Sequence, residues 1–159
     1  MQTYMTTKTE LQTKIQELET KLQDFKSQLS SYEEVTIETA SVGDVLEDGS
    51  IVLQKSNGLA LLVAPLSTEV EATWSKKFPE VFEALEGQGF NPSQWFIPTK
   101  EQLWLAYQSI PNEFALECDY WSSTEFDVTH AYGVDYFGDA GNINKSQKFC
   151  VRAFRCVTH

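Results

Sequence analysis

Residues 11–32 read LQTKIQELETKLQDFKSQLSSY, and this stretch decides how the chain is organised. Its apolar residues follow one another at alternating spacings of four and three, which is the a/d repeat of a coiled coil. Polar residues fill the positions between them, so a single helix would expose its only apolar stripe. The repeat therefore predicts a coiled-coil oligomerisation helix over residues 1–34, with contacts made by Leu11, Ile15, Leu18, Leu22, Phe25, Leu29 and Tyr32.

Two properties of this helix stay open at the level of sequence. Leucine at both a and d positions, with Phe25 and Tyr32 at d, is compatible with a dimer and with a trimer. In a parallel pairing some e/g contacts would attract, but Lys21 would face Lys26, so the charges do not decide the orientation. An amphipathic helix lying on its own domain is the less favoured alternative, because two apolar positions in seven make a narrow face for such a helix.

Beyond the heptads, the pattern changes to β-branched alternation at Val35-Thr36-Ile37, which predicts one further domain over residues 35–159. Its first part contains the turn signals Asp48-Gly49 and Asn57-Gly58. These turns separate three apolar segments, and together they predict a three-stranded meander with strands at residues 42–46, 51–54 and 59–64.

Two helices are predicted in the middle of this domain. Apolar residues recur at helical spacing from Phe78 to Leu85, and Thr99 with Gln102 fits a capping box at the start of a second helix. The chain then returns to strand patterns, at residues 120–124, 131–137 and 149–157, with a turn at residues 138–142. This order predicts an α+β domain with two helices and antiparallel sheets.

The composition narrows the possible partners. The chain has 159 residues and a formal net charge of −11, which disfavours nucleic acid and anionic membrane surfaces. Its longest apolar run, residues 59–66, is too short for a membrane helix, so no membrane insertion is expected. No signal-peptide pattern precedes the heptads, and we therefore expect Cys118, Cys150 and Cys156 to be buried thiols, with room for at most one disulfide.

Four blocks of the second domain resemble one family. They are WFIPTKEQL at residues 95–103, YWSSTE at 120–125, AYGVDY at 131–136 and VRAFR at 151–155. In this order they are similar to the C-type-lectin-like domains at the tips of phage tail fibres and of bacterial collagen-like adhesins. The resemblance spans roughly residues 42–157.

The resemblance implies a function of display and recognition. It suggests a homotrimer of the tail-fibre or receptor-binding type, assembled in the host cytoplasm and carried on the virion. Its expected partners are a host cell-surface glycan or protein receptor and other tail or baseplate proteins. The alternative is a structural connector or short decoration fibre that binds no receptor. The EPN, QPD and WND triplets of calcium-dependent lectins are absent, so neither a metal nor another cofactor is expected.

Candidate ligand-binding residues come from two polar, turn-rich segments near residues 125–130 and 138–147. A loop carries function when a rigid scaffold positions it. The candidates are Phe126, Asp127, Thr129, His130, Asp139, Asn142 and Asn144. Catalysis is not expected, because His130 and His159 are the only histidines and neither lies in a GxSxG or HExxH context.

Other prominent residues have a structural interpretation. Trp95 and Trp121 are predicted to fill the core, as are Tyr120, Tyr132 and Val134 on the strands. Arg152 and Arg155 are predicted to pair with acidic side chains such as Asp135 or Glu125.

Overall fold

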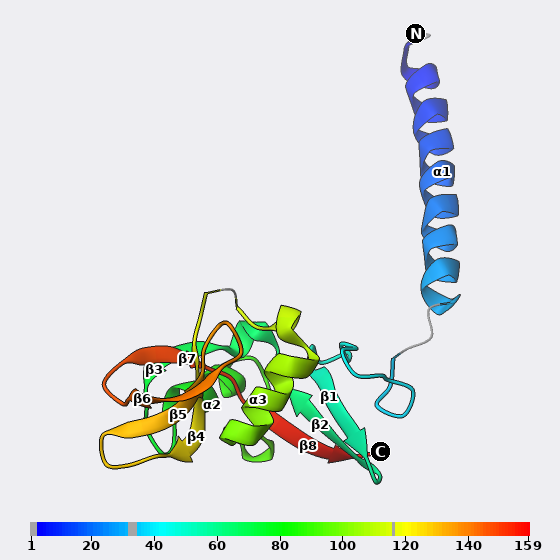
Figure 1. Ribbon diagram of the computed structural model, residues 1–159. Coiled ribbons are helices and arrows are strands. Elements are labelled where there is room, and N and C mark those ends of the chain that lie inside the picture. The colour runs from blue at the N-terminus through cyan, green and yellow to red at the C-terminus, as the bar shows by residue number, and fades with distance from the viewer. Residues whose placement is uncertain (1–2, 32–34, 116) are drawn as a thin grey trace. The chain divides into compact units, whose positions relative to one another are not determined.

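The computed structural model describes residues 3–31, 35–115 and 117–159 (Figure 1). The chain divides into two units, residues 1–34 and residues 35–159. The described residues form three α-helices, three short 3-10 helices and eight strands, so the protein is of the mixed α+β class. Among these described helices, none has both the length and the apolar character to cross a membrane.

The first unit contains one helix, α1 (Thr3–Ser31), of 29 residues. Six of the seven predicted contact residues lie within it, from Leu11 to Leu29, and their side chains are 55–74% exposed in the single chain. The seventh, Tyr32, lies outside the described residues. The helix therefore carries the predicted apolar stripe on its surface.

The second unit contains a three-stranded sheet in the order β1-β2-β8, with strands β1 (Ile51–Ser56), β2 (Leu59–Val63) and β8 (Phe154–Thr158). Asn57 and Gly58 join β1 to β2 with φ angles of 52° and 73°, as a tight hairpin turn requires. The predicted strand at residues 42–46 is wrong, because only an isolated bridge from Val45 to Ile51 forms there. The C-terminal β8 takes the place beside β2, a long-range pairing that a local pattern does not reveal.

A five-stranded sheet has the order β3-β7-β4-β5-β6, with bounds β3 (Val70–Thr73), β4 (Tyr120–Glu125), β5 (His130–Val134), β6 (Ala140–Asn144) and β7 (Lys148–Val151). It is mixed, because β4 and β7 run parallel while the other pairs are antiparallel. Strand β3 was not predicted. The predicted strand at 149–157 is broken at Arg152-Ala153, so its two halves, β7 and β8, belong to different sheets.

The turn between β5 and β6 begins earlier than predicted. The Asp135 carboxylate accepts hydrogen bonds from the backbone N–H groups of Phe137 and Asp139, both at 2.9 Å. Gly138 completes the turn with a φ of 87°. The side chain of Asp135 therefore ends β5, and residues 140–142, predicted to be a turn, belong to β6.

The two predicted helices are present as α2 (Pro79–Gly87) and α3 (Lys100–Ser109). The capping box is confirmed, because the Thr99 hydroxyl accepts from Gln102 N–H and the Gln102 side chain accepts from Thr99 N–H. Short 3-10 helices lie in the connections, η1 (Leu66–Thr68), η2 (Pro92–Gln94) and η3 (Pro111–Glu113).

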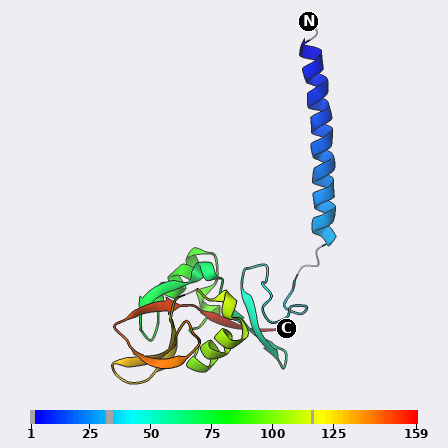
Figure 2. The same ribbon diagram turned by 45° about the horizontal axis from the view of Figure 1, so that its top comes forward.

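Helix α3 lies between the two sheets, as Figures 1 and 2 show. Its buried residues Leu103 and Tyr107 pack in one cluster with Leu53 of the smaller sheet and with Tyr120 and Val134 of the larger one. A second cluster, around Trp95 and Trp121, fills the space between α2 and the opposite face of the larger sheet. Both tryptophans are buried as predicted.

Candidate functional site

The β5-β6 hairpin brings together several of the predicted ligand residues. In its ladder His130 is opposite Asn144, Tyr132 is opposite Asn142, and Val134 is opposite Ala140. Because side chains alternate between the faces of a strand, these six residues share one face of the sheet. Val134 is buried against α3 at one end of this face, but Tyr132 is only half-buried, which corrects its prediction as a core residue.

A groove of about 620 Å³ lies between α3 and this face. It is lined by Lys100, Glu101, Trp104, Leu105, Tyr132 and Ala140. The Phe126 ring meets the Tyr132 ring edge-on, with centroids 5.4 Å apart, and the Lys100 ammonium lies 4.1 Å from the Tyr132 centroid. The groove therefore has aromatic walls with one cation and one carboxylate at its edge.

The loop from Phe126 to Thr129 is organised by the Asp127 carboxylate. Its Oδ1 accepts from the backbone N–H groups of Thr129 and His130, both at 2.7 Å, and from the Thr129 hydroxyl at 3.0 Å. The hydrogen bond from Thr129 N–H is the largest cause that lowers the pKa of Asp127 from 3.8 to about 2. The Nδ1 of His130 also lies 3.3 Å from this oxygen, and the four contacts together show that Asp127 shapes the loop.

Lys145 holds the same loop from the β6-β7 side. Its Nζ donates to the backbone carbonyls of Asp127 at 2.6 Å and Val128 at 3.1 Å, and it pairs with the Glu125 carboxylate. The ammonium also lies 4.5 Å from the centroid of the Trp74 ring. We call residues 125–129 with these contacts the clamped loop.

The clamped loop presents apolar side chains to solvent. Val128 is 90% exposed and Phe126 is 51% exposed. Sequence reasoning included Phe126 but missed Val128, Lys145 and Trp104. Trp104 had a sequence signal, because it lies off the buried helical face formed by Leu103, Ala106, Tyr107 and Ile110.

Two predicted residues do not belong to this group. Asp139 lies at the opposite end of the hairpin, where its backbone N–H and carbonyl bond to Asp135. Asn144 lies beside His130, but its side chain accepts from the backbone N–H and hydroxyl of Ser146 and so forms the following turn. The candidate surface therefore consists of the clamped loop, His130, Asn142 and the groove.

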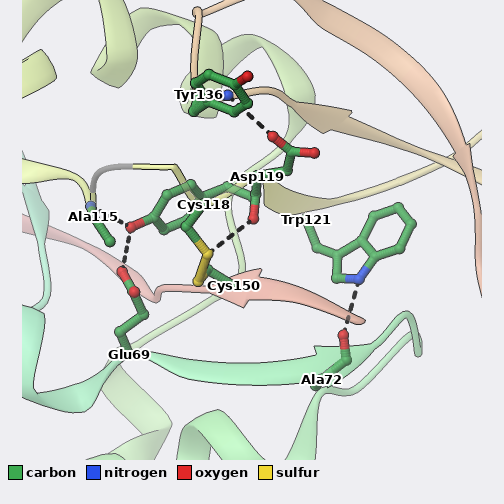
Figure 3. The surroundings of a disulfide bond; sticks show 9 residues. Glu69, Ala72, Ala115, Cys118, Asp119, Trp121, Tyr136 and Cys150 are labelled. Carbon is green, nitrogen blue, oxygen red and sulfur yellow. Dashed lines mark hydrogen bonds between the residues drawn. A yellow bond between two sulfur atoms is a disulfide. The ribbon is translucent and has the colours of Figure 1, made fainter. Parts of the chain in front are cut away.

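The prediction of three buried thiols is wrong, although the limit of one disulfide holds among the described residues. Cys118 and Cys150 form a disulfide across 32 positions of sequence, with their Cα atoms 6.3 Å apart (Figure 3). The parallel placement of β7 beside β4 brings them together, since Cys150 N–H donates to the Asp119 carbonyl at 2.9 Å. Cys156 is a free thiol but is exposed.

A partly buried polar cluster lies beside the disulfide (Figure 3). The Tyr120 hydroxyl donates to the Glu69 carboxylate and accepts from Ala115 N–H at 2.7 Å. Burial raises the pKa of Glu69, and burial together with the bond to Glu69 raises the pKa of Tyr120. In the part of the chain that the structure describes, Glu69, Cys118 and Cys150 are the one group close enough to share a metal, but both sulfurs are taken by the disulfide.

The arginine prediction is corrected as well. Arg152 is buried, and it donates to the backbone carbonyls of Ala64, at 2.7 Å, and Glu113 instead of pairing with an acidic side chain. Arg155 does pair with a carboxylate, but its partner is Asp48 at 2.8 Å. Asp135 and Glu125 are engaged elsewhere, in the β5-β6 turn and with Lys145.

Comparison with known proteins adds no assignment: no protein-family model matches the chain, and no curated protein matches it.

Proposed function

We propose that this protein is a homotrimeric display protein of the phage tail-fibre or receptor-binding type, in which α1 associates the copies and the second domain, of C-type-lectin-like fold, recognises the host surface. The clamped loop carries the recognition part of the proposal. Val128 is 90% exposed although it is apolar. The backbone of its loop is fixed by hydrogen bonds to Asp127 on one side and from Lys145 on the other.

Rigidity is what makes this loop suitable for binding. A loop that is already ordered loses little conformational entropy when a partner covers it, so more of the contact energy appears as affinity. Phe126 and Val128 supply the apolar contact, and the neighbouring Thr129, His130 and Asn142 supply hydrogen-bonding groups. Loops of this kind on a packed scaffold are where binding residues concentrate.

The exposed stripe of α1 supports the display part of the proposal. Six large apolar side chains at 55–74% exposure on one helix form a surface that a second copy would bury. Association would raise the overall affinity for a surface through avidity, because several copies of a weakly binding loop contact it together. The disulfide suits a protein that acts outside the reducing cytoplasm after assembly, as a virion component does.

The test is attachment of the purified, fluorescently labelled protein to a panel of bacterial strains. We expect Phe126→Ser with Val128→Ser to reduce attachment at least about tenfold, as truncation of an interface hot spot does, with only the small loss of melting temperature that removal of the Phe126–Tyr132 ring contact brings. The control is Leu59→Ser with Leu66→Ser, which removes two half-exposed apolar side chains, at 47% and 52%, from other parts of the domain.

The opposite result favours the structural connector. If the parent protein attaches to no strain, or if the loop variant attaches as well as the control, the clamped loop is not a receptor contact. Binding to other tail or baseplate subunits would then be the function to test.

A further inference from the structure

We infer that the groove between α3 and β5 binds one sugar unit of a neutral glycan. This inference rests on the proposed function, because it names the chemical class of the surface receptor. The groove has a volume of about 620 Å³, within the range of small-ligand pockets, and its walls are Trp104 and Tyr132.

Trp104 lies outside the buried face of α3. Its neighbours Leu103 and Ala106 are buried at 1% and 0% exposure, so α3 already has its core face, whereas the Trp104 side chain is 48% exposed. Trp74 is half-buried, and Trp95 and Trp121 are buried. An indole left half in water retains apolar area that a ligand can cover.

The opposite wall is fixed before any ligand arrives. Phe126 meets the Tyr132 ring at an interplanar angle of 89°, and the Lys100 ammonium lies on that ring. The start of α3 is tied to β4, because Lys100 N–H donates to the Thr124 hydroxyl at 3.0 Å. Both walls are therefore held by the scaffold, which is the condition for a preformed site.

The chemistry of the groove matches a sugar ring. A pyranose has apolar C–H patches on its faces, which stack on the electron-rich face of an aromatic ring, and hydroxyls around its edge. Asn142, opposite Tyr132 in the ladder, places a carboxamide on the same face of the sheet. A carboxamide both donates and accepts hydrogen bonds, as paired hydroxyls require.

Charge favours a neutral sugar over an acidic one. The Lys100 ammonium lies 3.8 Å from the Glu101 carboxylate, so the edge of the groove carries no net charge from this pair. The chain as a whole has a formal charge of −11, which repels sulfated or other polyanionic glycans. A neutral hexose or N-acetylhexosamine unit is therefore the expected occupant.

The experiment is binding of the full chain to an array of immobilised neutral oligosaccharides and sulfated glycosaminoglycans. We expect binding to a neutral member, reduced about tenfold or more by Trp104→Ala and less by Trp104→Phe. Leu66→Ala, which removes another half-exposed apolar side chain, should bind as the parent does. Acrylamide quenching of tryptophan fluorescence gives a second measurement on the unmodified protein, because a bound sugar should shield Trp104.

The inference is overturned if no neutral glycan binds, if Trp104→Ala binds as the parent does, or if sulfated glycans are preferred. It is also overturned if the bound sugar leaves the quenching unchanged. Failure here is distinct from failure of the proposed function. One combination of results separates the two proposals: the clamped-loop variant loses cell attachment, Trp104→Ala still attaches, and no neutral glycan binds. In that case the clamped loop still recognises the host surface, and only the assignment of a sugar to this groove is wrong.

Discussion

Helix α1 and the α+β domain differ in how far they bury their apolar side chains within one chain. The six stripe residues of α1 are 55–74% exposed, whereas residues such as Val52, Leu62 and Trp121 of the domain are at 0%. The domain closes its core within one chain, through pairings such as β2 with β8. In the proposed assembly other copies cover the stripe of α1, so the stability of this helix should depend on protein concentration.

The largest expected effect is on assembly. Leu18→Asp with Leu22→Asp should prevent the proposed assembly, because each leucine that assembly buries would contribute about 2–5 kcal/mol and a buried charge adds a further cost. The domain should melt as before. Sedimentation equilibrium measures the mass, and Gln16→Asp with Gln23→Asp is the control, since it adds the same charge away from the stripe. A monomeric parent at micromolar concentration would remove the contrast between the two regions.

The next effect concerns only the domain. Replacing Cys118 and Cys150 by alanine should lower its free energy of unfolding by about 3–4 kcal/mol, because the disulfide closes a loop of 32 positions. Urea denaturation measures this change, while the oligomeric mass should not change. Cys156→Ser is the control, and because Cys156 is exposed it should stay within about 0.5 kcal/mol of the parent. Three titratable thiols in unreduced, denatured protein would contradict the disulfide.

A smaller effect is expected within the domain, at the clamped loop. Lys145→Met removes the charged hydrogen bonds to Asp127 and Val128 and should cost about 1–2 kcal/mol. Amide hydrogen exchange of Thr129 and His130 should accelerate, with exchange in the core strands unaffected. Lys148→Met, an exposed neighbour on β7, should leave the loop unchanged. Equal loop protection in both variants would show that Asp127 suffices to hold it.

The smallest effect is a response of the same loop to acid. The pKa of Asp127 is lowered in the folded state to about 2 from 3.8. The ionised carboxylate therefore stabilises the folded loop above pH about 4, and this stabilisation is lost as the pH falls toward 2. The Thr129 and His130 amide signals in NMR spectra should shift across this window. Asp127→Asn, which keeps the acceptor but not the charge, should flatten the transition. An identical pH profile in that variant would assign the change to another group.

Local patterns were sufficient for features whose cause lies within a few residues. The helix over the heptad residues, the capping box of Thr99 and Gln102, and the Asn57-Gly58 hairpin were all predicted and are all present. The start of the β5-β6 turn was missed although its cause is also local. The side chain of Asp135 bonds to the following backbone, and the alternating apolar pattern through Phe137 concealed it.

The candidate site was predicted only in part, because alternation along a strand does not say what packs on it. Phe126, His130 and Asn142 were chosen as loop residues, and the structure places them around Tyr132, which was assigned to the core. Tyr132 is half-buried because α3 covers Val134 but leaves a groove beside Tyr132 and Ala140. Whether α3 covers Tyr132 depends on the position of the helix in the folded domain, which the local pattern of a strand does not encode.

The sequence alone determined the helix with its apolar stripe, the α+β order of the second domain and the burial of Trp95 and Trp121, because periodicity and residue size act locally. Only the tertiary structure decided the pairing of Cys118 with Cys150, the division of the last strand between two sheets and the backbone partners of Arg152. Each of these depends on segments far apart in the chain, whose contacts form when the whole core packs.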